Sequence, residues 1–110
     1  MSANNMGDML RNAGKIRKEI DRVQEGLKDR IVEGKTAAGE VVAFVNGQLD
    51  LLKITISPES VSTDPDDIEL LEDMILAAVA QGMEKARELK NSEISKVTGG
   101  FADNLSGLFS

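Results

Sequence analysis

Apolar side chains recur along the first thirty residues at alternating spacings of three and four. They are Met6, Met9, Ala13, Ile16, Ile20, Val23 and Leu27. Two apolar positions in every seven are typical of a coiled-coil seam. The pattern therefore predicts an amphipathic helix over residues 7–30, although two glycines off the seam, Gly14 and Gly26, weaken it.

The apolar period changes after this helix, where short segments rich in β-branched residues predict three strands over residues 30–36, 40–45 and 48–56. Asn46-Gly47 predicts a tight type I′ hairpin turn, because both residues tolerate a positive φ. Residues 37–39 provide a looser first turn. These turns predict an antiparallel meander, and alternation places three apolar side chains on one face of its last strand: Leu52, Ile54 and Ile56.

A second, longer helix follows a polar loop. Asp64-Pro65 fits an N-cap followed by proline at the first helical position, and helical spacing continues to about Val97. Gly99-Gly100 predicts the end of this helix, so residues 99–110 are expected to form a flexible tail. The resulting fold class is α+β in the order α-β-β-β-α, with a single domain over residues 1–98.

The two helices are too long for one small sheet to cover. They would measure about 35 and 50 Å, whereas a compact domain of this size has a radius of gyration of about 13 Å. Residues 70–80 are also apolar almost all the way round the helix. We therefore predict a two-fold homodimer, with the first helix folding back on the second within one chain as the alternative. The predicted interface is Leu71, Met74, Ile75, Ala78 and Val79.

Composition excludes most catalytic chemistry. The 110 residues include no Cys, His, Tyr or Trp, which removes the thiolate nucleophile, the usual general base and the commonest metal ligands. No phosphate-binding glycine motif occurs, so we expect neither an enzyme nor a cofactor. No apolar run reaches the roughly 18 residues of a membrane span, and the first residues lack the pattern of a secretory signal. A cytoplasmic location without membrane contact is the expectation.

Charge is segregated along the chain. The total is −6, but residues 9–28 hold six basic and three acidic side chains, whereas residues 59–73 hold seven acidic side chains and no basic one. Spacings of 4, 3 and 4 place four basic residues in one narrow band along the first helix, which we call the basic band: Arg11, Lys15, Lys18 and Arg22. Such a band can contact nucleic-acid phosphates. On charge alone, a solvated helix face with ion pairs such as Lys15–Glu19 is the commoner explanation.

Carboxylates crowd the start of the second helix. They lack the alternating ligands and central glycine of a calcium-binding EF-hand loop. The positive end of the helix dipole explains them more simply, so we expect no metal. The residues are Asp64, Asp66, Asp67, Glu69, Glu72 and Asp73.

Three stretches in the correct order resemble the YbaB/EbfC family of small bacterial nucleoid-associated proteins. Residues 39–47, GEVVAFVNG, match its G-x-V-x-V-x-x-N-G hairpin, and residues 71–79, LEDMILAAV, match its L-E-D-L-I-x-A-A helix. Between them Ile54-Thr55-Ile56-Ser57-Pro58 corresponds to an I-D-P-like turn, with Ser57 in place of the usual Asp. The resemblance covers nearly the whole chain.

This resemblance implies a tweezer-shaped homodimer whose projecting helices bind double-stranded DNA in the nucleoid with little or relaxed sequence preference. It implies a role in nucleoid organisation or gene regulation and no small-molecule substrate. It supplies no set of DNA contacts, so the expected ones are chosen by charge and position: Arg11, Lys15, Arg17, Lys18, Arg22 and Lys28. Should these be wrong, the next candidates lie on the second helix: Lys85, Arg87, Lys90 and Lys96. The alternative function is a module that docks a replication or recombination protein, which the acidic pI of about 4.6 favours.

Overall fold

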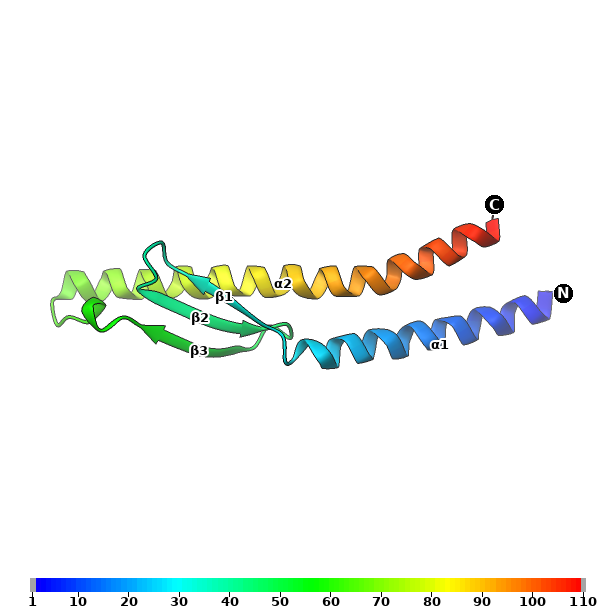
Figure 1. Cartoon of the computed structure of the whole chain (residues 1–110), viewed down its shortest axis with the longest axis horizontal. Helices are drawn as coiled ribbons and strands as arrows, with labels where there is room; N and C mark the ends of the chain where they lie inside the picture. Colours follow the sequence, from blue (N-terminus) through cyan, green and yellow to red (C-terminus); the bar gives the residue numbers. More distant parts are fainter. Residues whose placement is uncertain (1, 110) are drawn as a thin grey trace.

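The computed structural model describes residues 2–109 and the side chains of residues 5–100. The predicted α+β order is confirmed. In Figure 1 the sheet lies along the first half of the last helix, and the first helix lies beside its second half, in a body measuring 75 × 24 × 16 Å. The elements are α1 (Ser2–Leu27), β1 (Ile31–Lys35), β2 (Val41–Asn46), β3 (Leu51–Ile56), the 3₁₀ turn η1 (Pro58–Ser60) and α2 (Pro65–Phe109).

The sheet is the predicted antiparallel meander in the order β1-β2-β3. Its central strand alternates strictly, because Val41, Ala43 and Val45 are fully buried while the residues between them are half-buried. Val41 and Ala43 form the core with Ala78 of α2, and Ile54 of β3 packs beside them. The small core therefore lies between one face of the sheet and the first half of α2.

Two glycines allow β1 to approach α2 closely. A Cβ atom at Gly34 would overlap the backbone of Ala78 and of Gly82, and one at Gly82 would lie 2.8 Å from a methyl carbon of Val45. No side chain fits between the strand and the helix at this point. The packing distance of the sheet on α2 is therefore fixed by backbone contact.

The connection between β2 and β3 differs from the predicted type I′ turn. The N–H of Leu49 donates to the carbonyl of Asn46 at 3.0 Å, and Leu49, not Gly47, has a positive φ of 68°. The Asn46 side-chain oxygen accepts from the N–H groups of Gln48 and Asp50 at 3.0 Å. These bonds make a three-residue loop over residues 47–49, so β3 begins at Leu51 and not at Gln48.

Both helix ends differ from the prediction. α1 begins at Ser2 and ends at Leu27, because the N–H groups of residues 28–30 bond three residues back in a tightened last turn. α2 continues through Gly99 and Gly100 to Phe109. A glycine ends a helix by adopting a positive φ, and neither of these glycines does so. The Asp64 cap is confirmed, since its Oδ1 accepts from the N–H of Asp66 at 2.9 Å. Mobility of the tail stays a prediction.

We expect Gly34→Ala to lower the free energy of unfolding by about 2–3 kcal/mol, because the added methyl group must push β1 off α2. Gly14→Ala is the control, because a Cβ at Gly14 of α1 meets open space. This control should be neutral or stabilising by up to about 1 kcal/mol. Urea denaturation followed by circular dichroism measures both, and equal stabilities would contradict the packing described.

Candidate nucleic-acid interface

The apolar seam of α1 faces α2 within the same chain. Leu27 is 2% exposed, Ile20 and Val23 are half-buried, and Met6 at the other end is 67% exposed. α1 contacts α2, and Leu27 also lies against Gly47 in the loop between β2 and β3. The first helix therefore lies along the second at its base, while the tip of the seam stays open. This contact within one chain leaves the predicted homodimer untested.

The basic band lies on the opposite face of α1. With 3.6 residues per turn, its four positions point away from those of the seam. All four side chains are exposed, and those of Arg11 and Arg22 are 73% and 75% accessible. The flanking Arg17 and Lys28 are exposed as well. The fold therefore exposes all six predicted DNA-contact residues to solvent on α1, which we call the arm.

Two cations of the band are held by local carboxylates. Arg11 pairs with Asp8 at 2.8 Å, and Arg22 donates two hydrogen bonds to Glu19. The hydrogen bond from Arg22 lowers the pKa of the Glu19 carboxyl below its ordinary value and raises the pKa of Arg22. The expected Lys15–Glu19 pair is thus replaced by Arg22–Glu19. Exposed pairs of this kind contribute little to stability and are screened by salt.

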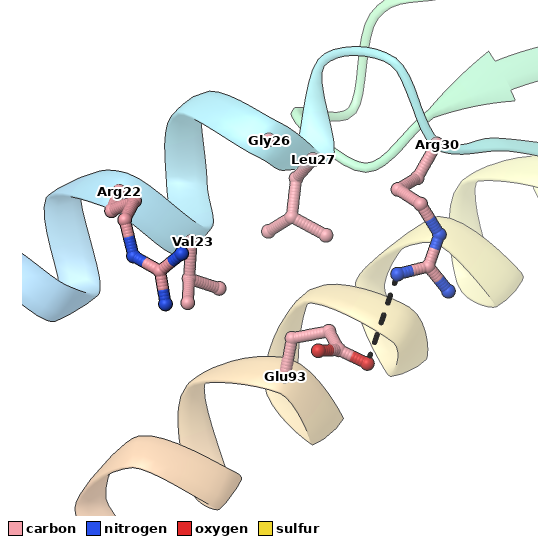
Figure 2. Close-up of a pocket in the computed structure, with 6 residues that line it drawn as sticks. All are labelled: Arg22, Val23, Gly26, Leu27, Arg30 and Glu93. Atoms are coloured by element: carbon pink, nitrogen blue, oxygen red, sulfur yellow. Dashed lines mark ion pairs between the residues drawn. The ribbon is translucent and has the colours of Figure 1, made fainter.

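A cleft opens where α1 leaves the body, and Figure 2 shows Arg30 reaching across it toward Glu93 of α2. The Nη1 atom of Arg30 lies 3.9 Å from a carboxylate oxygen of Glu93, which also pairs with Lys96 at 3.0 Å. Arg22 lines the same cleft. Sequence reasoning missed Arg30 because it placed this residue at the junction of the first helix and the first strand, and only folding brings it opposite Glu93.

The cations of α2 are less available than those of α1. The Nζ atom of Lys85 donates to the carbonyl of Glu33 in β1 at 3.0 Å, which ties it to the sheet. Arg87 pairs with Glu84 at 2.8 Å, Lys96 pairs with Glu93, and Lys90 is half-buried. Pairs of the same kind hold Arg11 and Arg22 of α1, so the difference between the helices lies in their lysines. Lys85 is tied to the sheet and Lys90 is half-buried, whereas Lys15 and Lys18 are exposed, which favours α1 as the nucleic-acid interface.

The predicted dimer residues pack first against their own sheet. Ala78 is completely buried within the chain and leaves no surface for a partner. The other four are half-buried around the core: Leu71, Met74, Ile75 and Val79. Three other leucines of the chain are more exposed than these four: Leu70 (57%), Leu76 (69%) and, on β3, Leu52 (50%).

The acidic cluster at the start of α2 is exposed to solvent. Asp64 caps the helix, and Asp66 and Asp67 occupy its first turn, near the positive end of the dipole. Over the part of the chain that the structure describes, no three carboxylates converge as metal ligands would. A search of the same part finds no helix that is long and apolar enough to cross a membrane.

Comparison with known proteins identifies the class. Residues 1–101 match the YbaB/EbfC DNA-binding family, so the chain belongs to that family and the resemblance is confirmed. The family consists of DNA-binding proteins and not of enzymes. A nucleoid-associated protein of Acetivibrio thermocellus is 44% identical, over 96% of this chain and 90% of its own. One from Caldanaerobacter subterraneus is 45% identical, over 96% and 91%.

The fold has a counterpart among solved structures. The crystal structure of an uncharacterized protein from Helicobacter pylori superposes with a TM-score of 0.60. The match covers 73% of this chain and 90% of the other, at 22% identity. This likeness supports the α+β architecture alone.

We expect Arg22→Gln to raise the pKa of Glu19 toward its ordinary value, because the hydrogen bonds that favour the carboxylate are lost. In the parent protein this pair stabilises the fold at neutral pH, and its contribution disappears as pH falls through the lowered pKa. An NMR titration of the side-chain carboxyl measures the change. A Glu19 pKa that is the same in both proteins would contradict the ion pair.

Proposed function

We propose that the protein binds duplex DNA as a homodimer, with little sequence preference, through the basic band of α1. The observation that carries this proposal is the position of the band: Arg11, Lys15 and Lys18 are exposed on the face of α1 opposite the seam. Arg22, also exposed, lies at the base of α1 beside the cleft between the two helices. Family membership and the nucleoid-associated relatives support DNA as the ligand and the nucleoid as the location.

The chemistry of the band favours contact with phosphates over contact with bases. Lysine and arginine on one exposed helix face gain affinity by releasing counterions condensed on DNA, which is a gain that every sequence offers. The acidic start of α2 lies at the far end of the molecule from the chain termini (Figure 1). Repulsion keeps that end away from DNA, so binding is directed to the arms despite the net charge of −6.

A second copy supplies the cover that one chain lacks. Among the side chains of residues 5–100, few large apolar ones are buried, such as Leu27, Val41 and Val45, whereas Leu70 and Leu76 stay more than half exposed. Exposure of such leucines to water is unfavourable. A two-fold interface uses the same surface on both chains, so it would bury these leucines in each of them. The dimer would also present two basic bands to one DNA duplex.

Replacing the four residues of the basic band by alanine should weaken binding almost equally for all DNA sequences. Two arms neutralise about eight phosphates, so the parent slope of log K against log salt should be up to roughly −7. The variant should lose most of that slope and keep its fold. Binding titrations at several salt concentrations measure it, with circular dichroism as the folding control.

Single substitutions provide the matched comparison for this site. Lys15→Ala should flatten the slope by about one unit per arm, whereas Lys53→Ala should not, because Lys53 lies on β3 over the Phe44 ring. If the variant with all four band residues replaced by alanine folds and keeps the parent affinity and salt slope, the basic band is not the DNA-binding site. The cations of α2 would then be tested, and no DNA binding at all would favour the protein-docking alternative.

We expect light scattering at micromolar concentration to give the mass of two 11.8 kDa chains. The exposed leucines of α2 are the physical reason. The mass should not change in high salt, because apolar contact is not screened as charge pairs are. A single-chain mass would remove the two-armed binding mode and halve the expected salt slope.

A further inference from the structure

The C-terminal end of α1 is capped by the loop between β2 and β3. The last carbonyl groups of a helix lack partners within the helix. Here the carbonyl of Leu27 accepts the N–H of Gly47 at 2.9 Å, and the carbonyl of Gln24 accepts the side-chain Nε2 of Gln48, also at 2.9 Å. The arm is therefore joined to the sheet by hydrogen bonds as well as by the chain itself.

This loop is itself held firmly. Asn46 is 2% exposed, and its side-chain oxygen accepts from the N–H of Gln48 within the loop and from that of Asp50 just after it. Leu49 has a φ of 68°, in the left-handed region that is unfavourable for leucine. Such a conformation persists only where the surroundings determine it fully. The loop therefore behaves as a rigid extension of the sheet.

The loop and the arm also touch directly. A Cβ atom at Gly47 would lie 2.7 Å from Cδ2 and 2.8 Å from Cβ of Leu27, so only glycine leaves room for the helix end. Leu27 is 2% exposed, whereas Met6 at the tip of the same seam is 67% exposed. The contacts that hold α1 on the rest of the molecule are therefore concentrated at its C-terminal end.

A small rotation at the base moves the tip of the arm a long way. A 26-residue helix is about 39 Å long, so a tilt of about 10° displaces its tip by about 7 Å. A charge-assisted hydrogen bond to phosphate has a length of about 3 Å. The orientation of the arm at its base therefore decides whether the whole basic band can meet one DNA backbone.

We propose that the loop of residues 47–49 sets the direction of the DNA-binding arm and that Gln48 is its positioning residue. This inference rests on the proposed function of α1. Gln48 is uncharged, so it adds no phosphate contact to the band, and it acts through its hydrogen bond to the carbonyl of Gln24. Holding the arm in its binding orientation before DNA arrives reduces the entropy cost of binding, which is how a residue outside the interface raises affinity.

Gln48→Met removes the donor and keeps the length and charge of the side chain. DNA affinity should fall roughly three- to tenfold, the scale of one lost hydrogen bond, while the salt slope stays unchanged. Gln81→Met is the matched control. Gln81 also bonds a distant backbone group, the N–H of Lys35 in β1 at 2.7 Å, but it does not hold the arm. Its affinity should stay within twofold of the parent.

A spectroscopic distance measurement tests the position of the arm directly. The chain has no cysteine, so Asn12→Cys on α1 and Asn91→Cys on α2 accept spin labels at those sites alone. In labelled protein diluted with unlabelled protein, Gln48→Met should broaden the distance distribution between them, and Gln81→Met should not. Gln48→Lys, which returns a donor beside the helix C-terminus, should restore the narrow distribution.

An unbroadened distribution in Gln48→Met would overturn the proposal, as would a broadened one with unchanged DNA affinity. Equal loss of affinity in Gln81→Met would also overturn it, by showing a general effect on the fold. If the parent protein binds no DNA, the proposed function fails, whereas the distances still decide whether Gln48 holds the arm.

Discussion

Backbone contact between β1 and α2 at Gly34 and Gly82 is the constraint on which the rest of the structure depends. It lets a three-stranded sheet sit close enough to one helix to bury Val41, Ala43 and Val45 with few large side chains. A core of this size covers only part of α2, so α1 and the second half of α2 extend side by side beyond the sheet. The shape follows from how little the sheet can cover.

Charge and shape act together in the arm. The apolar seam of α1 turns toward α2, so the opposite face, with Lys15 and Lys18, is left to solvent. The seven acidic residues of the chain's middle segment gather near the start of α2, at the other end of the molecule. A protein with a net charge of −6 thereby keeps one basic surface. Net charge is a poor guide to partners when the fold separates charges of opposite sign.

Sequence patterns predicted the elements and the exposed basic band because both depend on local periodicity. Seven-residue spacing identified α1, and alternation identified β2. Sequence patterns failed where a residue contacts another that is far away in the chain. Asn46-Gly47 predicted a type I′ turn, but the positive φ falls at Leu49, and the absence of a side chain at Gly47 makes room for Leu27 instead. Gly99 and Gly100 looked like a stop, although a single glycine lowers helix stability by only about 1 kcal/mol.

The sequence by itself determined the order of helices and strands, the cap at Asp64 and the position of the basic band on one helix face, because each arises from neighbours in the chain. Only the tertiary structure decided which way that face points. It placed Arg30 opposite Glu93 and used Gln48 to cap α1, because contacts between residues far apart in the chain have no local signal. The interface chemistry is therefore local, and its presentation to a partner depends on the fold.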